Sequence, residues 1–182
     1  MSDAESQTRI ATAKLIRSYY DAFNAGDSEA MLAHLTDDVI HDVNQGERRV
    51  GKDKFRAFNA RMTHHYKETL TEIVVLVSKD GTRAAAEFNV NGTYLNTDSE
   101  LPPAQGQKYV LPAGTFFAIR DGKIARVTTY YNLTDWIAQG ALFAHGRCSD
   151  RPRRSGALRG GGTRAGPRCG LAPPGPRGVR SA

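Results

Sequence analysis

Residues 19–27 read Tyr19-Tyr20-Asp21-Ala22-Phe23-Asn24-Ala25-Gly26-Asp27, and they contain the end of one predicted helix and the start of another. Apolar residues before Gly26 recur at steps of three and four, the spacing of an amphipathic helix over 8–25: Ile10, Ala13, Ile16, Tyr20 and Phe23. Gly26 can take the left-handed conformation that ends a helix, and the Asp27 side chain can cap the next one. The sequence therefore predicts two consecutive helices joined by a tight turn.

The rest of the folded part changes from helical to strand-like spacing. The predicted elements are, in order, a strand at 39–46, a helix at 51–65, and strands at 70–77, 83–95, 107–120 and 123–133. Residues 96–106 form a loop with two prolines, and Asp121-Gly122 is a hairpin turn. Three helices followed by long antiparallel strands predict an α+β protein. We expect a cone-shaped α+β barrel, with the three N-terminal helices packed on a curved, mainly antiparallel sheet.

Positive charge is concentrated at the C-terminus. Residues 140–182 hold nine Arg, no Lys and one acid, a balance of +8, so residues 1–139 carry −2 of the formal +6. The same segment holds ten of the 18 Gly and five of the eight Pro, a composition that cannot build a core. We therefore expect a disordered N-terminus at 1–7, a folded domain at 8–139 and a disordered tail at 140–182. The abrupt change in composition also suggests translation in a shifted frame.

The composition also bears on compartment and partners. Both cysteines, Cys148 and Cys169, lie in the tail, so the predicted domain has neither disulfide nor thiolate. No leader-like segment and no apolar run near the roughly 20 residues of a membrane span is present, which predicts a cytoplasmic protein without a membrane partner. Phe143 is the only aromatic residue of the Arg-rich tail, too little for base stacking, so we expect no nucleic-acid partner. His64-His65 shares no ligand spacing with His34 or His41, so no metal is expected.

The 19–27 stretch, the acidic break after the second helix, Gly51 at a helix start and the turn Asp121-Gly122-Lys123-Ile124 resemble the nuclear transport factor 2-like superfamily. Within it, the sequence is most similar to ketosteroid isomerase-related and SnoaL-like proteins over residues 8–138. The resemblance implies the cone-shaped fold, a homodimer, and a small hydrophobic ligand handled without a cofactor. It does not fix one activity, because the superfamily includes isomerases, cyclases, dehydratases, epoxide hydrolases and plain binding domains.

The resemblance also implies a set of catalytic positions. Ketosteroid isomerases use an Asp base on the first strand, a Tyr on the first helix and a protonated Asp on a later strand. The Tyr corresponds to Tyr19. The base falls on Val43 when aligned from Asp37-Asp38, and on Asp42 only with a one-residue deletion. The third position falls on Gly114, and because such a donor is worth about 2.7–4 kcal/mol, steroid isomerase activity is not expected.

Strand alternation divides the polar residues of the first strand. Asp42 and Asn44 share one face, and His41 and Val43 share the other. Only one of these faces can meet the pocket. The base is therefore either the carboxylate of Asp42 or the imidazole of His41, and the sequence leaves both open.

An apolar pocket with a few polar groups is expected on the concave face. Its candidate ligand-binding residues are Asn44, Phe58, Met62, Phe88, Val90, Pro112, Gly114, Phe116, Thr129, Tyr131 and Trp136. The expected function is an isomerase, cyclase or lyase acting on an apolar carbonyl compound, with Asp42 or His41 as base and Tyr19 or Tyr131 as donor.

Two alternatives remain open. The first is a non-catalytic ligand-binding or assembly domain of the same fold. The second is an epoxide hydrolase, which would need two pocket acids and an Arg; the residues of suitable type are Glu87, Asp98, Arg120 and Asp121.

Overall fold

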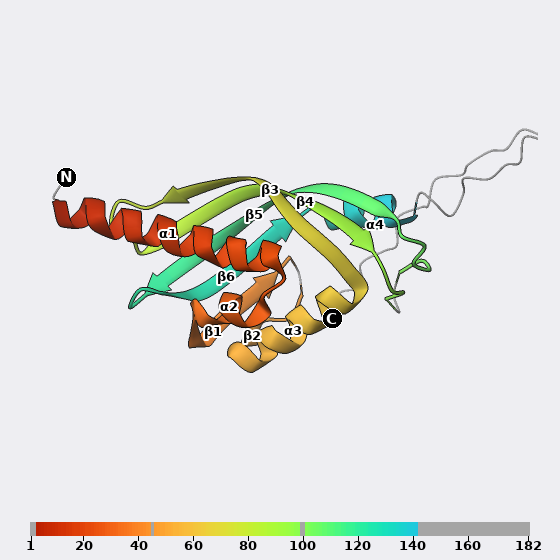
Figure 1. Ribbon diagram of the computed structural model, residues 1–182, viewed down its shortest axis with the longest axis horizontal. Helices are drawn as coiled ribbons and strands as arrows, with labels where there is room; N and C mark the ends of the chain where they lie inside the picture. The colour runs from red at the N-terminus through yellow and green to blue at the C-terminus, as the bar shows by residue number, and fades with distance from the viewer. Residues whose placement is uncertain (1–2, 45, 99–100, 142–182) are drawn as a thin grey trace, which may run out of the picture. The chain divides into compact units, whose positions relative to one another are not determined.

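The computed structural model describes residues 3–44, 46–98 and 101–141 (Figure 1). The helices are α1 (Asp3–Ala25), α2 (Ser28–Ala33), α3 (Lys52–His65) and α4 (Leu133–Ala141). The strands are β1 (Leu35–Val43), β2 (Arg49–Val50), β3 (Tyr66–Val77), β4 (Arg83–Tyr94), β5 (Lys108–Arg120) and β6 (Lys123–Tyr131). None of the helices in these ranges is long and apolar enough to cross a lipid bilayer.

The described strands form one sheet in the order β2-β1-β6-β5-β4-β3. Every neighbouring pair is antiparallel except β1 and β6, which run parallel. Figure 1 shows α1 running along the curled sheet, with α2 and α3 below it. The predicted fold class, an α+β cone with three N-terminal helices on a mainly antiparallel sheet, is confirmed.

The turn after α1 joins that helix to the sheet. Gly26 has a φ of +71°, in the left-handed region that favours glycine. The Asp27 side chain caps α2 by accepting a bond from the Ala30 amide at 2.9 Å. Asn24 bonds both backbone groups of Leu70 on β3, accepting from its amide at 2.8 Å and donating to its carbonyl at 3.0 Å. One short stretch thus ends α1, starts α2 and fixes β3 against the helices.

The core lies between α1 and the inner face of the sheet. Its buried members come from nearly every element and include Ile16, Tyr19, Tyr20, Leu35, Val39, Phe88, Phe117, Ile124 and Val127. A second buried cluster consists of Tyr66, Tyr94, Tyr109 and Leu111, with Trp136 of α4 packed against it. This second cluster closes the end of the sheet where α4 lies.

Several predicted boundaries shift. Helix α1 begins at Asp3, so residues 3–7, expected to be disordered, are helical, and Asp3 and Glu5 suit its first turn. Strand β3 follows α3 directly and starts at Tyr66 instead of residue 70. Strand β6 ends at Tyr131, and the helix α4 after it was not predicted. Apart from residues 140–141, which end α4, the tail predicted at 140–182 lies outside the described residues.

Candidate functional site

A cavity of about 140 Å³ lies between the helices and the inner face of the sheet. Most of its lining is apolar or aromatic. The residues around it are Tyr19, Tyr20, Phe23, Met31, His41, Val43, Phe55, Phe58, Asn59, Met62, Glu68, Leu70, Phe88, Val90, Leu111, Ala113, Thr115, Val127, Thr129, Tyr131 and Trp136. Since an apolar cavity of about 150 Å³ can hold benzene, this one has room for a ligand of about one ring.

His41 faces the cavity from β1. It lies on the buried phase of the strand, with Val39, and is 4% exposed. Its ring stacks on Phe55 at a centroid distance of 4.2 Å and meets Phe58 edge-on at 4.8 Å. Its Nδ1 is buried and has no hydrogen-bond partner among the described residues. A buried ring nitrogen of this kind is available to a ligand.

Burial also determines the charge of this imidazole. Loss of solvent, helped by the positive charge of Arg49, lowers the pKa of His41 to about 4. Arg49 itself lies over the Phe58 ring, 4.2 Å from its centroid. His41 is therefore neutral at pH 7 and able to accept a proton.

Hydroxyl groups supply most of the other polar surface of the cavity. Tyr19 lines it from α1, and burial raises the pKa of the Tyr19 phenol, which keeps it a protonated donor. Tyr131 lines it from β6, and burial likewise raises the pKa of Tyr131. Thr115 and Thr129 bond each other at 3.0 Å. The cavity can therefore offer hydrogen bonds to a carbonyl or hydroxyl oxygen.

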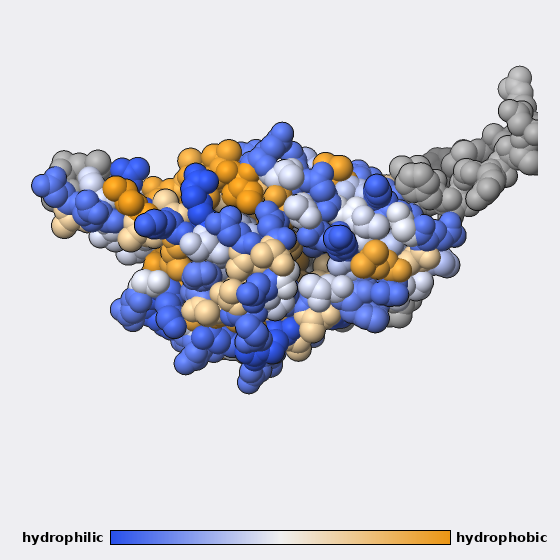
Figure 2. All heavy atoms as spheres, in the orientation of Figure 1, coloured by the Kyte–Doolittle hydropathy of each residue, from blue (hydrophilic) through white to orange (hydrophobic). Residues whose placement is uncertain are grey.

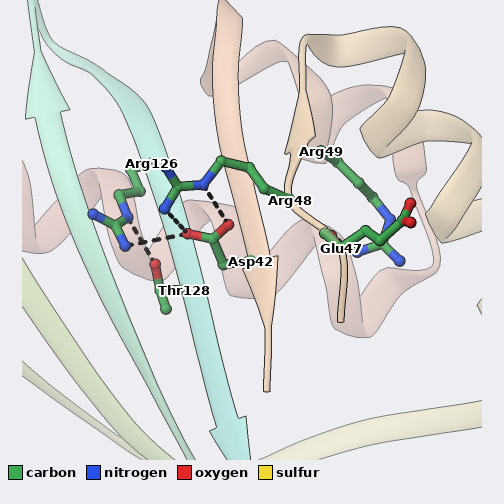
Figure 3. A network of polar contacts seen from close by, with 6 residues as sticks. All are labelled: Asp42, Glu47, Arg48, Arg49, Arg126 and Thr128. Carbon is green, nitrogen blue, oxygen red and sulfur yellow. Dashed lines mark hydrogen bonds and ion pairs between the residues drawn. The ribbon is translucent and has the colours of Figure 1, made fainter. Parts of the chain in front are cut away.

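Asp42 is not among the residues that line the cavity, and Figure 3 shows its carboxylate directed toward Arg48 and Arg126. Arg48 bonds both of its carboxylate oxygens, at 2.9 and 3.0 Å, and Arg126 reaches one of them at 3.1 Å. The hydrogen bond from Arg48 holds the pKa of Asp42 below its usual value. The sequence left open which face of β1 meets the cavity, and in the structure it is the face that carries His41 and Val43. The expectation of Asp42 as the base is corrected, because strand alternation places it on the outer face, bound to two guanidinium groups.

Strand β5 also has the opposite phase from the prediction. Pro112, Gly114 and Phe116 were expected to line the pocket, but Leu111, Ala113 and Thr115 do so. Phe116 is 50% exposed on the outer face. The match of Gly114 to a catalytic acid is therefore also corrected, since Gly114 lies on the wrong face. Neither inward-facing neighbour of Gly114 on β5 is an acid, because Ala113 carries a methyl group and Thr115 a hydroxyl group.

Asn44 supports the site without lining it. Its side-chain oxygen accepts from the Tyr131 backbone amide at 3.0 Å, and its backbone amide donates to the Thr129 carbonyl at 3.0 Å. It therefore secures the end of β6. The other expected residues line the cavity: Phe58, Met62, Phe88, Val90, Thr129, Tyr131 and Trp136.

Glu68 is the cavity residue that sequence reasoning missed. It lies on β3, between the inward-facing Tyr66 and Leu70, and its carboxyl accepts a hydrogen bond from Tyr109 at 2.5 Å. Burial raises the pKa of Glu68. The signal was the alternation of Tyr66, Glu68 and Leu70, which is lost when the strand is taken to begin at residue 70.

A second hollow, the groove, adjoins the cavity between α2, α3 and β3. It has a volume of about 400 Å³. The residues that line both spaces are Phe23, Met31, Asn59, Met62 and Glu68. A ligand longer than one ring could therefore extend from the cavity into the groove.

The lining bears on the epoxide hydrolase alternative. Glu68 is the only carboxylate among the cavity-lining residues, and none of them is an Arg. Asp98 is paired with Arg61 outside the cavity, and Arg120 with Asp38. The arrangement of two acids and an Arg is thus missing from this lining. No group of three metal-ligating side chains occurs in the described residues.

Fold and cavity together define a nuclear transport factor 2-like protein with an inner site of about one ring. The chain belongs to the SnoaL-like domain family, whose model matches residues 16–127. No curated protein is significantly similar to it.

Solved structures extend the comparison. A candidate polyketide cyclase from Xanthomonas campestris is 53% identical, with a TM-score of 0.72, over 72% of this chain and 98% of that one. Another from a Silicibacter species is 60% identical, with a TM-score of 0.69, over 71% and 94%. An epoxide hydrolase from Mycobacterium tuberculosis is 16% identical over 75% and 97%, with a TM-score of 0.56, and shares the fold alone.

Proposed function

We propose that this chain binds a small cyclic carbonyl compound in the cavity and catalyses proton transfer at the carbon next to the carbonyl. The observation that carries the proposal is His41: a neutral imidazole with an unpaired Nδ1, among apolar walls. A base for this step must accept a proton in a dry site while donors stabilise the oxygen of the enolate. His41 suits the first role, and Tyr19 or Tyr131 the second.

The relatives support a cyclase- or isomerase-type reaction. The structures 53% and 60% identical to the chain are those of candidate polyketide cyclases. Ring closure in a chain of carbonyl groups begins with loss of a proton from a carbon beside a carbonyl, which is the step proposed here. The size of the cavity favours one ring within it, with any further part of the substrate in the groove.

Exchange of carbon-bound hydrogen for deuterium tests the proposal without knowledge of the natural substrate. Cyclohexanone fits the cavity, and its exchange in D2O is followed by proton NMR. We expect the full chain to accelerate exchange, and His41→Phe to reduce that acceleration by about 100-fold. Asp42→Asn, a carboxylate change outside the cavity, is the control and should leave the rate unchanged.

Binding without exchange would favour the non-catalytic alternative. Trp136 lines the cavity and is the single Trp of the chain, so its fluorescence reports occupancy. Quenching by cyclohexanone with no gain in exchange would contradict the proposed enzyme and leave a ligand-binding domain.

A further inference from the structure

Glu68, Gly92 and Tyr109 lie side by side on three neighbouring strands, β3, β4 and β5. Glu68 on β3 pairs with Gly92 on β4, and Gly92 pairs with Tyr109 on β5. A Cβ added at Gly92 would lie 1.9 Å from Cζ of Tyr109, so the Tyr109 ring occupies the space that a side chain at position 92 would take. The ring reaches across β4, and its hydroxyl donates to Oε1 of Glu68 at 2.5 Å. Gly92 is therefore the gap through which a phenol on β5 contacts a carboxyl on β3.

The phenol of this pair is held firmly. Tyr109 is 3% exposed, and its ring packs edge-on against Trp136 and Tyr66, with centroid distances of 6.0 and 6.5 Å. The Tyr109 bond is the only hydrogen bond of the Glu68 carboxyl within the described residues, which leaves Oε2 for a ligand.

Few titratable groups surround Glu68. Its carboxyl interacts with the phenols of Tyr109 and Tyr131, and Tyr66 and Lys67 line the adjoining groove beside it. Burial favours the protonated carboxyl and raises the pKa of Glu68, while the Tyr109 bond opposes that rise. Among the described residues that line the cavity, there is no Lys or Arg to hold Glu68 in its charged form.

Glu68 and His41 both line the cavity, from strands that are far apart in the sheet. Three strands separate β1 from β3, about 19 Å along a flat sheet at strand spacing. The curl of the sheet brings both side chains to one cavity. A ligand there would have both an acid and a base among the residues around it.

We propose that Glu68 is a catalytic residue that protonates the carbonyl oxygen of the bound ligand, with Tyr109 as its positioning residue across Gly92. This inference rests on the proposed function. As His41 takes a proton from the carbon beside the carbonyl, the C–H electrons form the C=C bond, and the C=O electrons take the proton from Oε2 of Glu68. The products are an enol, an imidazolium and a carboxylate, and the Tyr109 hydroxyl stabilises the carboxylate.

Exchange of cyclohexanone hydrogen in D2O tests the role of Glu68. Glu68→Gln keeps the shape of the side chain but cannot provide the acidic proton, so we expect exchange to fall about 100-fold with little change in cyclohexanone binding. Glu72→Gln is the matched control, because Glu72 lies on the same strand, is exposed and is not a cavity residue. Equal exchange by the two variants would overturn the proposal.

The pH profile tests the positioning role of Tyr109. Since its hydrogen bond lowers the pKa of Glu68, Tyr109→Phe should shift the alkaline loss of exchange to higher pH as well as slow it. Gly92→Ala should displace the ring and slow exchange, whereas Gly114→Ala should not, because an added Cβ there meets only the Ala86 carbonyl, at 3.7 Å. If the exchange rate of Tyr109→Phe falls at the same alkaline pH as that of the native chain, Tyr109 only fills space and does not position Glu68.

Measurements of ligand binding distinguish failure of the proposed function from failure of the role of Glu68. If the native chain binds cyclohexanone without exchanging it, the proposed function fails. Glu68→Leu then tests whether Glu68 contacts the ligand. This variant should weaken the binding of cyclohexanone about tenfold more than the binding of methylcyclohexane, as expected for a lost hydrogen bond to a carbonyl. If Glu68→Leu weakens the binding of both ligands equally, or if the native chain binds neither ligand, the role of Glu68 is overturned as well.

Discussion

At the scale of single residues, the buried imidazole of His41 should make stability depend on pH. Its pKa is about 4 in the folded chain and 6.5 when unperturbed. Between these values the unfolded chain binds a proton that the folded chain does not, so the free energy of unfolding falls as the pH drops from 6.5 to 4. The contribution of His41 to this fall is at most about 3 kcal/mol.

Urea unfolding at several pH values measures this effect. The native chain should lose more stability than His41→Phe between pH 6.5 and 4, since the variant cannot take up that proton. Parallel curves for the two proteins would show that the imidazole is solvated in the folded chain.

Asp42 should matter for stability and not for reaction. Its carboxylate is bound by Arg48 and Arg126, both partly exposed, so Asp42→Asn should cost about 1 kcal/mol in urea unfolding. Cyclohexanone exchange should stay within twofold of the native rate. Asp38→Asn, which breaks an exposed pair with Arg120, is the control and should change neither. A tenfold loss of exchange in Asp42→Asn, without a similar loss in Asp38→Asn, would indicate that the Asp42 carboxylate takes part in the reaction.

From the sequence, His41 and Asp42 could be assigned to opposite faces of the strand, but which of the two faces meets the cavity could not be predicted. Alternation placed His41 and Asp42 on opposite faces, and the structure agrees. Which face meets the cavity depends on partners far along the chain: Phe55 and Phe58 on α3 enclose the imidazole, and Arg126 on β6 binds the carboxylate. Local periodicity carries no information about such contacts.

At the scale of elements, Asn24 should be the strongest single link between α1 and β3. It satisfies both the amide and the carbonyl of Leu70, so Asn24→Ala leaves two backbone groups without that partner. We expect a loss of about 2–3 kcal/mol, measured from the midpoint of urea unfolding. Asp27→Ala, which removes only the α2 cap, should cost about 1 kcal/mol. A smaller loss for Asn24→Ala than for Asp27→Ala would contradict this role.

The phase of β5 shows why strand faces are hard to assign from sequence. Tyr109, Leu111 and Phe117 alternate with Val110 and Phe116, so both faces carry large apolar residues. A one-residue error in phase exchanges the two faces completely. A shifted strand start also explains why Glu68 was missed: a β3 that begins four residues late omits the part of the strand that carries this half-buried carboxyl.

At the scale of the whole molecule, the outer face of the sheet is unusually apolar. Val74, Leu76, Phe116 and Tyr130 are 50–64% exposed there, and Phe116 packs edge-on against Tyr130 at 6.0 Å. Figure 2 shows apolar side chains gathered over the second half of β3. We propose that a second copy of the chain covers this face, since contiguous exposed apolar patches mark interaction sites.

Light scattering after size exclusion tests this homodimer. Phe116→Glu places a charge in the centre of the face and should convert a dimer to a monomer. Ile10→Glu, at an equally exposed apolar residue on α1, is the matched control and should leave the dimer intact. A native chain that elutes as a monomer would contradict the proposal.

The fold was predictable because its signals are local. The turn at Gly26 and Asp27, the helical spacing before it and the hairpin at Asp121-Gly122 lie within short windows, and the structure contains each of them. The cavity was only partly predictable, because its polar groups come together across strands that are distant in the sequence. The contact between Glu68 and Tyr109 spans 41 residues and depends on a glycine in a third strand.

A crystal structure of the full chain with 4-bromophenol tests the central claim, that the cavity is a ligand site between His41 and Glu68. The phenol mimics an enol, and the anomalous signal of bromine locates the ring. We predict a bromine peak inside the cavity, with the phenol oxygen within hydrogen-bond distance of Glu68 or His41. Bromine found only in the groove or on the outer face of the sheet would contradict it.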